Sequence, residues 1–245
     1  MHHRTQLLAV LGATLLATAA LPATALPPVT RPAEAGSTRP AEAGSTRPAE
    51  AGSVGADALL AKVRSCSQIS KGRYRSDEGS KADVPVCGKN GAVFFKADMD
   101  IDCDGQVTAR CNKKTDRWFQ GATAFQQSDG KPLNSEKLPF VVVPGASGIW
   151  NHRASGIRGG AVAAVVYRGR VRYAVVGDTG PSRIIGEASY AAARSLGIAP
   201  HPTNGGTASG VTYILFKNSK VSPIESNSAA TARGEALAKQ FIRNN

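Results

Sequence analysis

Six short segments rich in β-branched and aromatic residues constrain the fold of this chain more than any other feature. Gly, Pro, Asn or Asp borders each segment, as is typical of strands. The segments lie too close together for regular strand–helix–strand crossovers. We therefore expect a mainly β fold, a closed or nearly closed β-barrel with peripheral helices. The segments are GAVFFKADMDID, QVTARC, FVVVP, AVAAVVYRG, VRYAVVGD and GVTYILFK, and helical patterns appear at Ala56–Arg64, Ala188–Leu196 and Ala229–Arg243.

The N-terminal part of the chain reads differently from the rest. Residues 1–25 combine a short basic start, an apolar run and a small-x-small site, which is typical of a secretory signal peptide. Residues 26–53 contain TRPAEAGS three times, and these repeats carry no large apolar side chain, so we expect a disordered linker. Residues 54–245 are long enough for one domain with a full core. The sequence therefore predicts a secreted, extracellular protein.

The cysteines Cys66, Cys87, Cys103 and Cys111 all lie in the first half of this domain. Export favours disulfides, and three pairings of four cysteines exist. We favour Cys66–Cys87 and Cys103–Cys111, because each closes a short local loop. A zinc site is the weaker interpretation, since no CxxC pair is present.

The chain is basic, with a formal net charge of +12 at pH 7. A basic balance often indicates nucleic acid or an anionic surface. Here the Lys and Arg residues are scattered as singles and pairs, with no basic arm or helix. We therefore expect no nucleic-acid partner. No apolar run reaches the ~20 residues that a membrane-spanning helix needs, so we also expect no membrane partner.

A row of aspartates stands out against this basic composition. Asp98, Asp100, Asp102 and Asp104 occupy every second position of KADMDIDCDG. Side chains two apart in a strand share a face, so a strand would align the four carboxylates and turn Met99, Ile101 and Cys103 to the core. Such a row suits a cationic polymer with regularly spaced charges.

The same residues also match the start of a calcium-binding loop. With Asp100 at the first position, Asp102, Asp104 and Gly105 stand where such a loop needs them, but its last position is Cys111 rather than a bidentate Glu. A solvated loop with no partner is a further interpretation. The strand pattern is the strongest of the three.

A second informative stretch is GDTGPSRIIGEASY, where Asp178 and Glu187 border a Gly/Pro loop at the end of a predicted strand. Functional residues often lie on such loops. Each carboxylate also has a structural interpretation. Asp178 can be a turn residue, and we expect Glu187 to open the helix EASYAAARSLG, where an acidic residue is ordinary.

Four stretches, MDIDCDG, PFVVVP, GDTGPSRIIGEAS and GVTYILF, in this order and spacing, resemble the chitosanases of glycoside hydrolase family 75. The resemblance covers nearly the whole domain and implies an endo-acting, inverting hydrolase of β-1,4-linked glucosamine. It places the essential acidic pair at Asp178 and Glu187, with Thr179 beside them as a substrate contact. It also implies a six-stranded barrel similar to the double-psi type.

Within this resemblance we interpret Glu187 as the general acid. The base remains open between Asp178 and a member of the aspartate row, and the other members of the row would bind substrate ammonium groups. Trp118, Trp150 and Tyr190 are candidate sugar platforms or core residues. We expect chitosan as the substrate, no cofactor, no metal and a monomer. The alternatives are a transglycosylase-like or cellulase-like enzyme on the same barrel, or a non-catalytic calcium- or carbohydrate-binding module.

Overall fold

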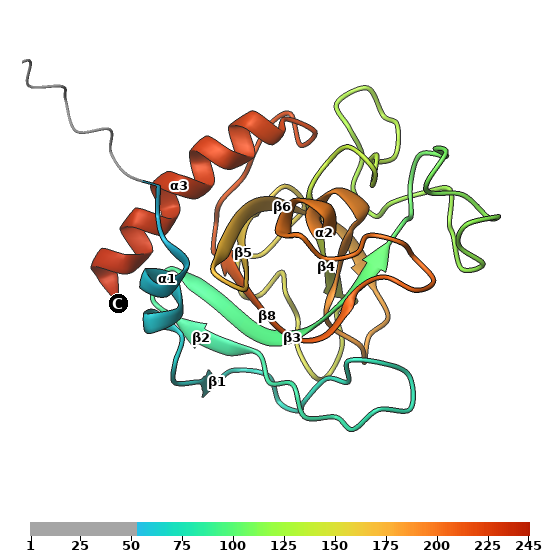
Figure 1. Cartoon of the computed structure of the whole chain (residues 1–245). Coiled ribbons are helices and arrows are strands. Elements are labelled where there is room, and N and C mark those ends of the chain that lie inside the picture. The colour runs from blue at the N-terminus through green and yellow to red at the C-terminus, as the bar shows by residue number, and fades with distance from the viewer. Residues whose placement is uncertain (1–52) are drawn as a thin grey trace, which may run out of the picture. The chain divides into compact units, whose positions relative to one another are not determined.

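The computed structural model describes residues 53–245, in which six strands form a closed barrel (Figure 1). The predicted signal peptide and nearly all of the predicted linker lie outside the described residues. The strands follow each other around the barrel in the order β3, β7, β4, β6, β5 and β8, and pairing of β8 with β3 closes it. The pairings are antiparallel except β3 with β7 and β4 with β6. The expected mainly β barrel with peripheral helices is confirmed.

The barrel strands are β3 (Ala92–Asp102), β4 (Phe140–Pro144), β5 (Val162–Tyr167), β6 (Arg170–Gly180), β7 (Glu187–Ser189) and β8 (Thr207–Phe216). Two short strands, β1 (Ser67–Gln68) and β2 (Cys87–Lys89), extend the sheet beyond β3. The helices are α1 (Ala56–Lys62), α2 (Tyr190–Leu196) and α3 (Asn227–Asn244).

Period-two alternation divides the core into two layers, because successive strand side chains point to opposite faces of the sheet. One hydrophobic cluster takes side chains from all six barrel strands, such as Phe95, Val176 and Tyr213, and fills the interior. The other includes Phe94 and Val175 and packs beneath α1 and α3. The barrel wall is therefore buried on both faces where the helices cover it.

Two sequence-based expectations about local structure are wrong. The segment Gln106–Cys111 is not a strand; it follows the end of β3 as an irregular loop. Glu187 does not open a helix, because α2 begins at Tyr190 and Ser189 is its N-cap, accepting a hydrogen bond from the backbone N–H of Ala192. Glu187 instead begins β7, where backbone pairing with β3 at Asp100 fixes it. A carboxyl group in the first turn of a helix is favoured in its ionised form by the helix dipole. Glu187 is not in that turn, so the dipole of α2 does not act on it in this way.

Both expected disulfides are present, Cys66–Cys87 and Cys103–Cys111. The first joins the segment after α1 to β2. The second anchors the loop that follows β3, because Cys103 lies between Asp102 and Asp104 and is buried. The aspartate row therefore runs from a paired strand directly into a covalently held loop.

Candidate active site

A cleft of about 480 Å³ lies over the carboxyl ends of β3 and β6 and the start of β7. Residues 116 and 118, the end of β6 with the residue that follows it (179–181) and the loop at residues 202–205 contribute to its lining. The acidic side chains that line it are Asp100, Asp102, Asp104, Asp116, Asp178 and Glu187. None of these carboxylates forms an ion pair with a Lys, Arg or His among residues 53–245. The cleft is therefore an acidic region on a basic protein.

Asp178 reaches the cleft from β6 through an irregularity in the strand. The pairing of β4 with β6 shifts register between Val141 and Val142, immediately before Asp178, and such bulges redirect side chains near functional sites. The backbone N–H groups of Ala124 and Thr179 donate to Asp178 Oδ1 at 2.8 and 2.7 Å. Burial raises the pKa of Asp178, and these two donors oppose the rise because they favour the ionised form.

Glu187 is held differently, since its carboxyl group accepts no hydrogen bond from the described residues. Burial first, and then the charges of Asp100, Asp104 and Asp178, raise the pKa of Glu187 to about 7. Gly180 gives it room: a Cβ at that position would lie 2.5 Å from Glu187 Oε2. Two neighbouring carboxylates thus differ in environment, and Glu187 holds its proton at a higher pH than an ordinary Glu.

The aspartate row lies largely as the strand pattern predicts. Met99, Ile101 and Cys103 are buried in the barrel interior, and the row is on the other face of β3. Asp102 and Asp104 point to Asp178, with one oxygen of each of the three carboxylates within 4.8 Å of the others. Burial is the main cause that raises the pKa of Asp104 to about 6 and the pKa of Asp102 well above its ordinary value.

Asp98 is the member of the row that the cleft does not include. Its side chain is buried, and it lies with Asp77 and Asp100 in a second cluster of carboxylates. The pairing of β3 with β8 shifts register between Ala97 and Met99, at the position of Asp98. The row is therefore not one continuous surface.

The candidate sugar platforms separate clearly by exposure. Trp118 is 72% exposed and lines the cleft, with the Arg117 guanidinium 4.8 Å from its ring centroid. Trp150 and Tyr190 are buried in the core, so their ring faces are not available to a ligand. Trp118 is an aromatic surface beside carboxylates, an arrangement that suits a sugar ring carrying a positive charge.

Two acidic residues near the row were not found from the sequence. Asp116 lines the cleft from the loop that the Cys103–Cys111 disulfide anchors, and Asp77 lies 21 residues before Asp98 in an irregular segment. Neither belongs to a repeating pattern, and only the folded chain brings them to the row. The arrangement can combine proton transfer between two unlike carboxyl groups with binding of cationic groups along a cleft.

Comparisons with known proteins agree with this chemistry. The family described as fungal chitosanase of glycosyl hydrolase group 75 matches residues 99–243. Endo-chitosanase C of Aspergillus oryzae is 30% identical over 194 residues, which are 77% of this chain and 46% of that protein. Endo-chitosanase of Aspergillus fumigatus is 32% identical over 142 residues, 52% of this chain and 59% of that protein. The chain thus spans about half the length of the curated relatives it matches.

Among solved structures, the Streptomyces papain inhibitor matches with 19% identity and a TM-score of 0.33, covering 55% of this chain and all of that protein. This likeness is too distant to inform the function. None of the helices within residues 53–245 has the length and apolar character needed to cross a membrane.

Proposed function

Because the chain belongs to the group 75 glycosyl hydrolase family of fungal chitosanases, we propose that it hydrolyses β-1,4 linkages between glucosamine residues of chitosan from within the polymer. The observation that carries this proposal is the unequal pair of carboxyl groups in an acidic cleft. Glu187 has a pKa of about 7, and Asp178 accepts two backbone hydrogen bonds. The relatives' names supply the substrate, and the cleft supplies a chemical reason for it.

Glu187 is the general acid in this proposal. Glycoside hydrolysis needs a protonated carboxyl group at the leaving oxygen, and a pKa of about 7 keeps Glu187 mostly protonated in mildly acidic solution. The reaction also needs a carboxylate that activates water, if the anomeric centre is inverted. Asp178 is our first choice for this base, because two N–H donors favour its ionised form. Asp102 and Asp104 lie beside it and are the alternatives.

The remaining carboxylates bind the substrate. Chitosan carries an ammonium group on each deacetylated sugar, and the carboxyl groups of Asp100, Asp102 and Asp104 line the cleft without an ion pair to any Lys, Arg or His of residues 53–245. Thr179 lies beside Asp178 in the cleft wall and is positioned to contact the same sugar. Trp118 offers its exposed ring to a sugar face.

Substitution of the two principal carboxyl groups tests the proposal. Glu187→Gln and Asp178→Asn each keep the side-chain size, and each should lower the release of reducing ends from chitosan by about 10²–10⁴-fold. Asp83→Asn, an exposed change away from the cleft, is the matched control and should retain wild-type turnover. Cellulose serves as a second substrate. Wild-type turnover by a folded Glu187→Gln protein would refute the assignment, and preferential cleavage of cellulose would refute the substrate.

We also propose that the protein is exported, that residues 1–25 are removed, and that residues 26–53 connect to a catalytic domain at residues 54–245. The support is the signal-peptide pattern and the composition of the repeats. N-terminal sequencing of the protein recovered from culture medium tests this. A mature chain that begins at Met1 would contradict it.

A further inference from the structure

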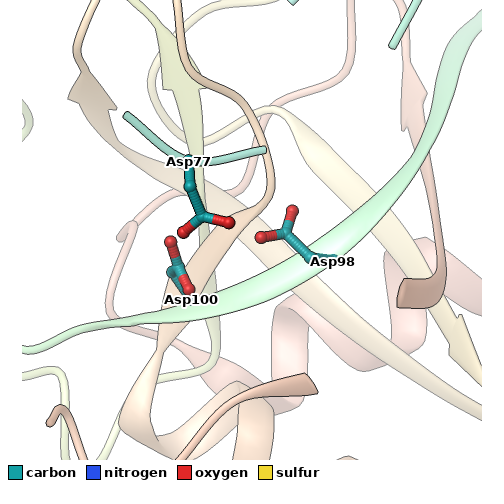
Figure 2. Close-up of side chains that lie close together, drawn as sticks. All are labelled: Asp77, Asp98 and Asp100. Carbon is teal, nitrogen blue, oxygen red and sulfur yellow. The ribbon is translucent and has the colours of Figure 1, made fainter. Parts of the chain in front are cut away.

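The carboxylates of Asp77, Asp98 and Asp100 converge at one end of the aspartate row (Figure 2). One oxygen from each of the three lies within 4.8 Å of the other two. Oxygens bound to a single calcium ion at ~2.4 Å can be up to ~4.8 Å apart, so the spacing admits one ion between them. The cluster is separate from the carboxylates around Asp178, although Asp100 borders both.

Asp98 is the observation that distinguishes this cluster from an ordinary acidic patch. Its side chain is only 4% exposed, and its Oδ1 atom has no hydrogen-bond partner among the described residues. Figure 2 shows its carboxyl group directed to Asp77 and Asp100. Burying a carboxylate without a partner costs several kcal/mol, and native proteins normally pair such groups with a cation or a metal.

Within residues 53–245, no Lys, Arg or His forms an ion pair with these carboxylates. The ion pairs among residues 53–245 are Lys131–Asp129 and Lys239–Glu235, and neither involves the cluster. Burial, followed by the charges of Asp100 and Asp77, raises the pKa of Asp98 to about 7. Burial and then the charge of Asp77 raise the pKa of Asp100 to about 6. The three groups repel one another when they are ionised, and a cation between them would remove this repulsion.

The backbone holds the cluster in place from both sides. Tyr74 pairs with Val84, and Arg75 bridges to the segment before Glu187 through hydrogen bonds from Arg75 N to Arg183 O (2.9 Å) and from Ile185 N to Arg75 O (3.0 Å). These contacts fix the segment that carries Asp77.

On the opposite side, Tyr213 Oη donates to the backbone oxygen of Asp98 at 2.8 Å. Gly186, with φ 122°, leaves space for the Asp98 carboxyl group, because a Cβ there would lie 2.0 Å from Asp98 Oδ1. Backbone contacts thus position Asp98 and the start of the segment that carries Asp77.

We propose that Asp77, Asp98 and Asp100 bind a divalent cation that prefers oxygen ligands, with calcium as the best fit. Three carboxylates and no nitrogen or sulfur ligand match the preference of calcium, and water would complete its six to eight ligands. The site lies outside the catalytic pair and does not rest on the proposed function. Bound calcium would stabilise the fold by joining the segment around Asp77 to β3.

Thermal unfolding and calorimetric titration of the full chain, first treated with EDTA and dialysed, test the site. Calcium chloride should raise the Tm by roughly 5–10 °C once it exceeds the Kd a hundredfold. Asp77→Asn should weaken calcium binding at least tenfold, and Asp77 is exposed, so this variant should fold. Asp83→Asn, a change of the same kind six residues away, should bind calcium as the wild type does.

Three outcomes would overturn the proposal. The first is that a 10-fold or higher molar excess of calcium over the wild-type protein produces neither a Tm shift nor heat of binding. The second is loss of calcium binding in Asp104→Asn with full binding in Asp77→Asn, which would place the ion among the carboxylates around Asp178. The third is a Tm shift with glucosamine hydrochloride but not with calcium, lost in Asp77→Asn, which would make the cluster an ammonium site. None of these readouts depends on hydrolysis, so failure of the cation site and failure of the proposed function are distinguishable.

Discussion

At the scale of single residues, the difference between Glu187 and Asp178 determines how the rate should depend on pH. A general acid works only when protonated, so with Glu187 in the role proposed above, activity should fall as pH rises through about 7, the pKa of Glu187. The base works only when ionised, so activity should also fall at acidic pH as Asp178 takes up a proton. The kcat/KM profile should therefore be bell-shaped.

Asp104→Asn tests the origin of the alkaline side of this profile. The charge of Asp104 is one cause of the raised pKa of Glu187, so its removal should lower that pKa and shift the alkaline limb to lower pH. The comparison is between variant and wild type on one glucosamine oligomer, because the substrate amines titrate alike in both assays. An alkaline limb that stays in place would show that Asp104 does not act on Glu187.

At the scale of elements, the two disulfides should have separable effects. Cys103–Cys111 anchors the loop that supplies Asp116, Trp118 and the backbone N–H of Ala124 that donates to Asp178. Replacing both cysteines by Ala should therefore lower the Tm and reduce kcat/KM tenfold or more. Loss of a native disulfide typically costs about 2–5 kcal/mol of stability.

Cys66–Cys87 is the matched control, since it joins the segment after α1 to β2 away from the cleft. Its removal should lower the Tm but leave kcat/KM of the remaining folded protein near wild type. Melting curves and reducing-end assays of both double variants make the comparison. Equal losses of kcat/KM would mean that the loop after β3 does not depend on its own disulfide.

The strands themselves were largely predictable, because period-two alternation and turn residues are local signals. The register of those strands was not. Glu187 was expected in a helix because its neighbours are good helix formers, whereas parallel pairing with Asp100 makes it the first residue of β7. The approach of Asp77 to Asp98 depends on a bridge between Arg75 and Ile184. Such long-range pairings leave no mark in the local pattern.

At the scale of the whole molecule, charge distribution should govern how the enzyme responds to salt and to acetylation. The chain has a formal net charge of +12, yet six carboxylates line one cleft. Screening shortens from ~10 Å at 0.1 M to ~3 Å at 1 M ionic strength. Added sodium chloride should therefore raise the KM for chitosan several-fold while kcat changes less.

Acetylation removes the positive charge of the amino group of the sugar. Like added salt, it should therefore raise the KM for chitosan. Cleavage should slow as the degree of acetylation rises, and Asp102→Asn should make KM less sensitive to both changes. Initial-rate series on chitosans of two degrees of acetylation, each at low and at high salt, give four KM values for the wild type and four for the variant. A KM that responds to neither salt nor acetylation would show that the carboxylates of the cleft do not recognise ammonium groups.

The unequal exposure of the two tryptophans gives the molecule an optical property. Trp150 is buried at 5% exposure, so its emission depends on the interior, whereas Trp118 stands 72% exposed beside the cleft. A sugar that covers Trp118 displaces water from the indole ring and shifts its fluorescence, while Trp150 supplies a nearly constant background. The fluorescence of Trp118 can therefore report the binding of a sugar in the cleft. The measurement needs no label and uses a variant that does not hydrolyse its substrate.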